Sequence, residues 1–320
     1  GDGSWSATPT VAFDEGSNNV SVTATDPAGN VSAATTLALI IDTAAPTAPP
    51  ATLATASDSG TTGDNTTSDT TPTIAGTGAT AGDTITVTTP KGEVLTATVA
   101  GDGSWSATPT VAFDEGSNSV SVTATDPVGN VSAATTLALV IDTAAPAAPP
   151  ATLAAASDSG VTGDNKTSDT TPTINGTGAT AGDTISVTTP KGEVLTATVA
   201  GDGSWSVTPT VALDDGSNAF AVTATDPAGN ESAATTLTLT VDTAAPTVTV
   251  SAASNDIDWD ETTTLTFTLS EPSLDFGSDD ISVSGATISA FSGSGSTYTA
   301  TFTPTGSGAI GVSVDAGQFE

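Results

Sequence analysis

The chain contains no cysteine, no histidine and no methionine, and only 4% of its 320 residues are aromatic. Disulfide bonds, thiol chemistry and zinc sites built from cysteine and histidine are therefore excluded. Without histidine or cysteine, the usual serine or cysteine triad of a hydrolase cannot be assembled. No apolar run approaches the roughly 18 residues that identify a membrane-spanning helix. We therefore expect no catalytic residues and no insertion into a membrane.

Positive charge is also almost absent from the sequence. Lys91, Lys166 and Lys191 are the only basic residues beside 36 acidic ones, which gives a formal net charge of −33. Binding to nucleic acid requires a basic surface that displaces counterions, so we expect no nucleic acid partner. An anionic membrane surface would repel the chain for the same reason. The carboxylates of such a chain need either water or a cation around them.

The sequence repeats with a period of 100 residues. Residues 1–100 and 101–200 align without a gap and differ at nine positions, and the match continues from residue 201 to about residue 246. This period is longer than the roughly 20–50 residues of solenoid and propeller repeats and has the size of one complete domain. We expect the closing part of a domain at 1–43 (domain 1), complete domains at 47–143 and 147–243 (domains 2 and 3), and a different, incomplete domain at 247–320 (domain 4).

The apolar residues of each repeat alternate with polar ones, as in half-buried strands. In domain 2 the alternation runs through 83–88, 94–99 and 120–124, with turn residues spaced about 8–12 positions apart. This pattern predicts an all-β fold of tandem Ig-like or fibronectin III-like antiparallel β-sandwiches, each with seven strands, of which 71–76 is the first. Trp105 shares a face with Ala107, so we expect it to fill the core.

Proline-rich segments separate the domains. Residues 42–50 form the first junction and 142–150 the middle junction, and clustered proline favours an extended, semi-rigid spacer. The third junction, 242–246, leads directly into strand-like residues 247–250.

Because strand direction alternates, turns can be assigned to the two ends of a domain. With 71–76 as the first strand, the segment 58–69 and the turn 126–130 are expected at the N-terminal end of domain 2. The acids expected at its C-terminal end are Asp83, Asp102, Asp114, Glu115 and the exit residue Asp142. At the middle junction Asp142 would then face four residues of domain 3: Asp158, Asp164, Asp169 and Asp226.

Carboxylates that gather at a junction repel one another, by about 4 kcal/mol for a pair 4 Å apart at an effective dielectric constant of 20. Calcium relieves this repulsion because it accepts about 6–8 oxygen ligands in tolerant geometry, whereas magnesium demands a strict octahedron. We therefore predict calcium ions (Ca²⁺) at the junctions. The candidate ligands are Asp42, Asp58, Asp64, Asp69, Asp126, Asn130, Asp142, Asp158, Asp164, Asp169, Asp226, Asn230, Asp242, Asp256, Asp258 and Asp260.

The alternative for any single aspartate is a solvated turn, in which the side chain bonds to nearby backbone. For Asp83, Asp102, Asp114 and Glu115 we prefer this explanation. In domain 4 the acidic run 255–261 follows the third junction, and we expect it to form the counterpart site with Asp242.

Three phrases resemble a known family. Residues 124–132 (ATDPVGNVS), 142–146 (DTAAP) and 158–173 (DSG through DTTPT) are similar to the tandem bacterial Ig-like domains of large RTX-type and biofilm-associated adhesins. Domain 4, with 269–272 (LSEP), resembles a second Ig-like subfamily of the same proteins. The resemblance implies extender domains of a secreted, cell-surface adhesin whose junctions are stiffened by calcium. It also implies that the adhesion target is bound by another region.

Two other functions remain open. The chain could be a glycan-binding accessory module of a secreted protein, for which Trp259, between Asp258 and Asp260, is the candidate platform. A glycosidase with paired carboxylates is conceivable, but the acids lie on short turns that recur in every repeat. The stalk interpretation requires only the neighbouring domains of the same chain and calcium as partners.

Overall fold

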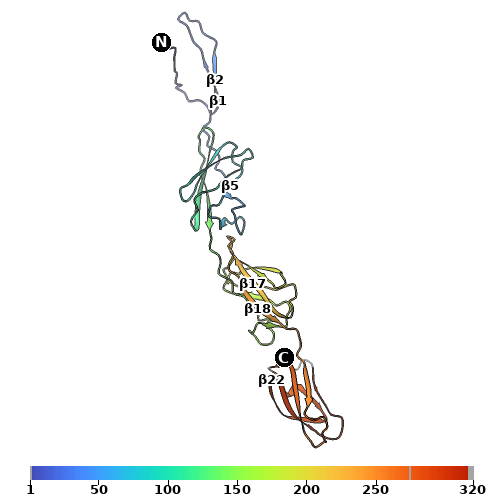
Figure 1. Ribbon diagram of the computed structural model, residues 1–320. Coiled ribbons are helices and arrows are strands. Elements are labelled where there is room, and N and C mark those ends of the chain that lie inside the picture. Colours follow the sequence, from blue (N-terminus) through green and yellow to red (C-terminus); the bar gives the residue numbers. More distant parts are fainter. Residues whose placement is uncertain (1, 274, 316–320) are drawn as a thin grey trace.

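The computed structural model describes residues 2–273 and 275–315, and these residues form an all-β chain. The domains follow one another in a row from the N-terminus to domain 4 (Figure 1). In the described ranges the helical content is a single 3-10 turn, Ser278–Asp280. None of the helices described there has the length and apolarity needed to span a bilayer.

Domain 2 is a sandwich of two sheets. A five-stranded sheet has the order β4-β10-β9-β6-β7, and a three-stranded sheet has the order β3-β5-β8. All pairs are antiparallel except β4 with β10. The strands are β3 (Thr52–Leu53), β4 (Thr66–Thr67), β5 (Ile74–Gly76), β6 (Thr84–Thr88), β7 (Val94–Thr98), β8 (Trp105–Ala107), β9 (Gly116–Thr125) and β10 (Thr135–Ile141).

Domain 3 repeats this topology, with sheets β12-β18-β17-β14-β15 and β11-β13-β16. Its strands are β11 (Thr152–Leu153), β12 (Lys166–Thr167), β13 (Ile174–Gly176), β14 (Thr184–Thr188), β15 (Val194–Thr198), β16 (Trp205–Val207), β17 (Gly216–Thr225) and β18 (Thr235–Val241). The predicted fold of tandem Ig-like sandwiches is confirmed.

The strand assignment inside a domain needs one correction. β3 and β4 are the two halves of a first strand that passes from one sheet to the other, and each half has only two residues. Two residues are too short to show an alternating pattern, so the segment 71–76 was wrongly taken as the first strand. It contains β5, which is the second. The chain at 111–113 is not a strand, although Phe113 is buried.

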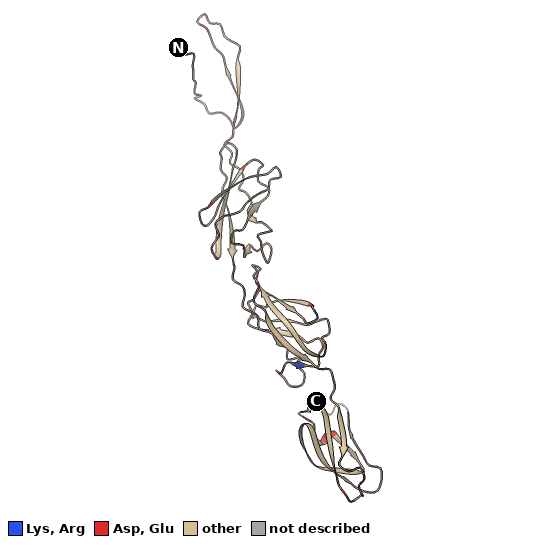
Figure 2. Cartoon of the chain, viewed as in Figure 1, with Lys and Arg blue, Asp and Glu red and all other residues tan. Residues whose placement is uncertain are grey.

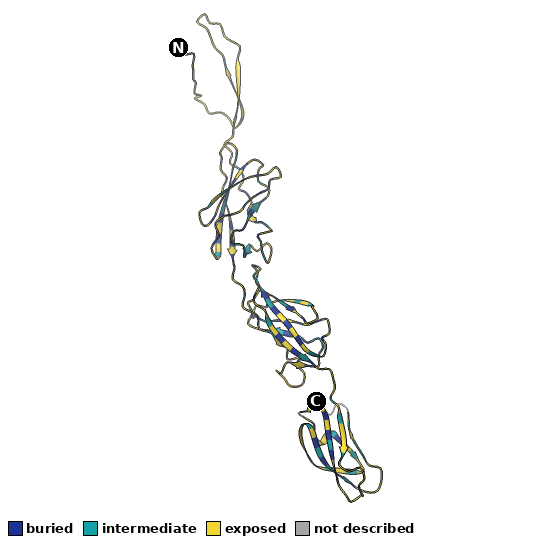
Figure 3. Ribbon diagram, viewed as in Figure 1, coloured by how far each residue is buried: buried dark blue, intermediate teal, exposed yellow. Residues whose placement is uncertain are grey.

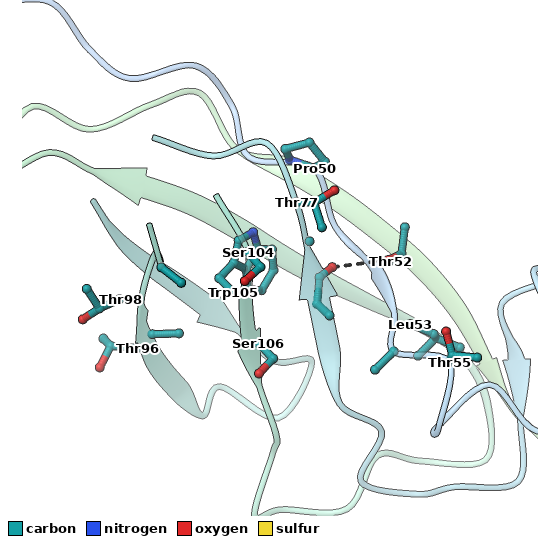
Figure 4. Close-up of a pocket in the computed structure, with 15 residues that line it drawn as sticks. Pro50, Thr52, Leu53, Thr55, Thr77, Thr96, Thr98, Ser104, Trp105 and Ser106 are labelled. Carbon is teal, nitrogen blue, oxygen red and sulfur yellow. Dashed lines mark hydrogen bonds between the residues drawn. The ribbon is translucent and has the colours of Figure 1, made fainter. Parts of the chain in front are cut away.

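The core lies between the two sheets and is built from the inward-facing residues of each strand (Figure 3). Trp105 is only 5% exposed, as predicted, and packs beside Gly76. A Cβ atom on Gly76 would lie 2.6 Å from Trp105 Nε1 and 2.1 Å from the Pro50 carbonyl oxygen. Figure 4 shows Trp105 among the residues that line a surface pocket, together with Pro50 and Thr77. A small residue on β5 therefore makes room for the indole.

Domains 1 and 4 differ from the repeated pair. Residues 1–43 contain the antiparallel hairpin β1 (Gly16–Val22) and β2 (Thr35–Ile41), and Trp5 there is 71% exposed. Domain 4 has a three-stranded sheet β19-β20-β22 and a two-stranded sheet β21-β23. Its aromatic core includes Phe276 and Tyr298, whose ring centroids are 5.0 Å apart. The strands are β19 (Val248–Ala252), β20 (Thr263–Ser273), β21 (Ile281–Ser284), β22 (Ala286–Pro304) and β23 (Gly311–Val314).

Candidate metal site at the domain junctions

The corrected strand order changes which acidic turns meet at a junction. β4 pairs with the end of β10, and the Asp142 amide donates to the Thr67 carbonyl oxygen at 3.0 Å. The segment 58–69 therefore lies at the C-terminal end of domain 2, and its predicted position at the N-terminal end is wrong. The charge of Asp83 interacts with that of Asp126, so Asp83 lies at the N-terminal end, opposite to its predicted position.

The turn before β8 is misplaced for the same reason. The amide of Ala79 donates to the Gly103 carbonyl oxygen at 3.2 Å, which puts Asp102 at the N-terminal end beside the β5–β6 connection. Overlooking β3 shifted the strands from β5 to β8 by one, and such a shift reverses the expected direction of the chain. Counting 111–113 as a strand restored the expected direction from β9 onward. Asp114, Glu115 and Asp142 do lie at the C-terminal end, where Glu115 accepts a hydrogen bond from Thr143.

At the middle junction the exit of domain 2 meets the turn 226–230 of domain 3. Asn230 Nδ2 donates to the Asp142 carbonyl oxygen at 2.8 Å and to Asp226 Oδ2 at 2.9 Å. The first junction repeats this contact, because Asn130 Nδ2 donates to the Asp42 carbonyl oxygen at 3.1 Å. Both asparagines and both exit aspartates are among the predicted ligands. They connect successive domains through a backbone carbonyl group.

Asp183 is the most unusual carboxylate at the middle junction. It immediately precedes β14, and Asp226 immediately follows β17, at the place where these two strands pair. Asp183 is 2% exposed, and its Oδ2 atom has no hydrogen-bond partner among the described residues. Burial raises the pKa of Asp183, and the charges of Asp226 and Asp142 raise it further. Three carboxylates from two domains thus repel one another around a buried, unsatisfied oxygen.

The first junction has the same feature. Asp83 is 2% exposed and its Oδ2 atom also lacks a partner in the described chain. Burial raises its pKa, followed by the charge of Asp126. A buried anionic oxygen without a donor is unfavourable unless a cation approaches it. The charged groups that act on Asp183 and Asp83 are carboxylates, whose oxygen atoms suit a hard cation such as calcium.

The described residues do not hold a ready-made metal cluster of three or more acidic side chains. A cation between Asp142, Asp183 and Asp226 would therefore draw their carboxylates inward. Lysine does not neutralise this group. Lys91 is paired with Asp114 and Lys191 with Asp214, and Lys166 lies in β12 beside the end of β18, at the far end of domain 3. Figure 2 shows how sparse the basic positions are beside the acidic turns.

The predicted acids of the segment 58–69 are bonded within their own loop. Asp58 accepts from the Gly63 amide at 2.6 Å, Asp64 from the Thr66 amide at 2.7 Å, and Asp69 from Ser57 Oγ at 2.9 Å. Asp158, Asp164 and Asp169 make the equivalent bonds in domain 3. They lie at the far end of domain 3, so the expected contact of Asp142 with these three residues is wrong. Among them, Asp58 and Asp158 each keep a buried Oδ1 atom without a partner in the described part.

The expected site in domain 4 is not assembled around Asp242. The five residues of β19 lead the chain away from the junction by about 17 Å. Asp256, Asp258 and Asp260 follow β19 and are exposed at the distal end, while Asp242 accepts from the Ala244 amide at 3.1 Å. The acidic run is close to the junction in sequence but not in space.

A family profile described as a bacterial Ig-like domain matches residues 1–43, 45–143 and 145–243, and a second profile of the same description matches 242–320. The chain belongs to the bacterial Ig-like domain family. The search of curated proteins found no match. Domains 2 and 3 are thus two bacterial Ig-like domains of one type, and domain 4 is of another.

Several solved structures are similar to this chain at low sequence identity. One is a tetra-tandem repeat in the extending region of a large adhesion protein, 22% identical over 94% of this chain and 74% of that chain, with a TM-score of 0.27. A 1.5-MDa bacterial ice-binding adhesin is 23% identical over 81% and 88%, with a TM-score of 0.34. The Escherichia coli adhesin FdeC is 19% identical over 83% and 94%, with a TM-score of 0.33. At these scores the likenesses do not assign a function.

From the sequence, Asp83 is assigned to plain turn chemistry, and Asp183, the equivalent residue of domain 3, is not considered. A signal for their burial is present in the sequence, because Asp83, Ile85 and Val87 occupy alternate positions of one strand. Ile85 and Val87 are fully buried, and the same face continues through Asp83. In domains 2 and 3, the aspartate in register with the core is the one that is buried without a partner in the described residues.

Proposed function

We propose that the chain is an extender, or stalk, segment of a secreted bacterial adhesin at the cell surface, and that calcium stiffens its junctions. Membership of the bacterial Ig-like family, the near-identical repeats and the row of domains support a spacer. Such domains are structural modules without catalysis, and the adhesion target is bound elsewhere in the parent protein. The observation that carries the calcium part is the buried, unpartnered Asp183 beside Asp142 and Asp226.

Calcium bound at the middle junction would act on both domains at once. Asp142 belongs to domain 2, whereas Asp183 and Asp226 belong to domain 3, so a shared ion restrains bending between them. Extracellular calcium modules bind calcium with Kd values of about 10⁻⁴–10⁻³ M, so millimolar calcium occupies a large share of such sites. At a calcium concentration ten times the Kd, binding to one site stabilises the ordered junction by about 1.4 kcal/mol.

Calcium should make the whole chain longer on average and more resistant to heat. Small-angle scattering and thermal unfolding of the full chain, in millimolar calcium and in EDTA, measure both effects. Magnesium at the same concentration is the control ion, because it keeps its waters and fits a multi-carboxylate site poorly. If the maximum dimension and the melting temperature are the same in calcium and in EDTA, the calcium part of the proposal is wrong.

One observation favours a second function, glycan binding by domain 4. Trp259 is 66% exposed and stands between Asp258 and Asp260, whereas Trp105 and Trp205 are buried. Exposed aromatic rings with polar neighbours are suited to sugar rings. A glycan array probed with the full chain and with Trp259→Ala separates the two functions, since a stalk gives no signal that depends on Trp259.

A further inference from the structure

A loop of domain 2 contacts a turn of domain 3 at the middle junction. The clasp loop, residues 59–61, touches the receiving turn, residues 227–229. The Thr61 amide donates to the Pro227 carbonyl oxygen at 2.9 Å, and Ser59 Oγ donates to the Ala228 carbonyl oxygen at 2.5 Å. Ala228 is 0% exposed, although it lies in a turn. These contacts involve no carboxylate and require no cation.

Two glycines allow the close approach. Gly60 has φ +68°, and a Cβ atom there would lie 2.2 Å from the Pro227 carbonyl oxygen and 2.5 Å from the Gly229 amide. Gly229 has φ +88°, and its Cβ would lie 2.9 Å from the Gly60 amide. Backbone therefore packs on backbone, which only glycine permits at this separation.

The same loop in domain 3 has no such neighbour. Gly160 has the same φ of +68°, yet a Cβ atom on it would meet nothing within 4 Å. Domain 3 has the same two donors, because Ser159 has a hydroxyl group as Ser59 does and Val161 has a backbone amide as Thr61 does. Domain 4 is of the second Ig-like type, and its sequence contains no Asp-Pro-Ala-Gly-Asn turn. The clasp loop is repeated at the third junction without a turn to receive it.

We propose that the clasp loop is an interdomain recognition element specific for the Asp-Pro-Ala-Gly-Asn turn of a following domain of the same type. It stiffens the middle junction without metal. The third junction, which lacks the receiving turn, is a hinge. This inference goes beyond the calcium-stiffened stalk, because it predicts a difference between two junctions when calcium is absent.

The chain offers matched variants to test the clasp. Gly60→Ala and Gly160→Ala impose the same left-handed strain, but only Gly60→Ala creates a clash across a junction. Ala228→Val adds two methyl groups to the buried position of the receiving turn. The equivalent turn of domain 2 already carries Val128, which is 63% exposed, so valine does not prevent the turn from folding.

Because the chain has no cysteine, spin labels can be attached at introduced cysteines alone. Labels at Thr96 and Thr196, both exposed strand positions, measure the distance across the middle junction. Labels at Thr196 and Thr268 measure the distance across the third junction. Electron-electron double resonance on the full chain in EDTA then gives a distance distribution for each junction. Circular dichroism of every variant shows whether the domains remain folded.

We expect a narrow distribution at the middle junction and a broad one at the third. Gly60→Ala and Ala228→Val broaden the middle distribution, whereas Gly160→Ala changes neither. If Gly60→Ala and Gly160→Ala give the same middle distribution, or if the third junction is as narrow as the middle one, the clasp proposal is overturned. Since EDTA is present throughout, neither result depends on the calcium site.

Discussion

Replacing Asp183 with asparagine is expected to abolish calcium binding at the middle junction while domain 3 remains folded. Asp183 supplies the buried oxygen that has no other partner, so its loss removes a charged ligand from the centre of the site. Loss of a supporting group alone lowers the affinity of metal sites by about 10–100-fold, and loss of a ligand should do at least as much. Isothermal titration of the full chain measures the change as a smaller number of calcium ions bound per chain.

The charge-matched control is Asp202→Asn. Asp202 lies at the same end of domain 3, but it is exposed and already accepts from Ser204. This variant removes the same formal charge without touching the buried oxygen, so the calcium isotherm should not change. Equal losses in Asp183→Asn and Asp202→Asn would mean that calcium responds to net charge and not to a site.

In EDTA, where no calcium is lost, Asp183→Asn is expected to raise the melting temperature. The raised pKa of Asp183 means that folding disfavours its charged form. The contribution of Asp183 to the free energy of unfolding therefore falls as the pH rises. The fall begins near 3.8, the ordinary pKa of aspartate, and is complete above the raised pKa of the folded state. The variant has no such group, so its advantage in melting temperature should be larger at pH 7 than at pH 4. Melting curves at the two pH values measure the difference.

Truncating Trp105 to alanine is expected to cause a large loss of stability in domain 2. Trp105 is 5% exposed and closes the core of domain 2 over Gly76. Removal of a buried tryptophan side chain costs about 3–5 kcal/mol, against a total of about 5–15 kcal/mol for a domain. Urea unfolding of the full chain should show one domain that unfolds at a much lower denaturant concentration while the others are unchanged.

Two variants test the physical cause of that loss. Trp259→Ala removes the same side chain from an exposed position and should leave every transition in place. Trp105→Phe should cost much less than Trp105→Ala, because the indole nitrogen has no partner in the described residues and only volume is lost. If Trp105→Ala unfolds no earlier than Trp259→Ala, Trp105 is not a core residue.

The fold could be predicted from the sequence because its signals are long and repeated. Val120, Val122 and Ala124 alternate with polar residues in β9, and the 100-residue period marks the domains in the sequence alone. Trp105 was placed in the core by the same alternation. These features depend on local pattern alone, so they do not require knowledge of which strands pair.

The junctions could be predicted only in part, because they depend on counting strands. β3 is two residues long and carries no pattern, yet overlooking it reversed the ends to which Asp83 and the segment 58–69 belong. The turn 126–130 and Asp142 lie at the predicted ends because counting 111–113 as a strand compensated for the missing β3. Contacts such as that of Ser59 with Ala228 join residues far apart in the chain, so no local sequence pattern predicts them.

Buried negative charge at the middle junction is expected to be neutralised by a cation. Crystals of the full chain grown in millimolar calcium, measured for anomalous scattering, test it directly. The account predicts an anomalous peak about 2.3–2.6 Å from carboxylate oxygens of Asp142, Asp183 and Asp226. An ordered junction with water at that position and the three carboxylates turned toward solvent would contradict it.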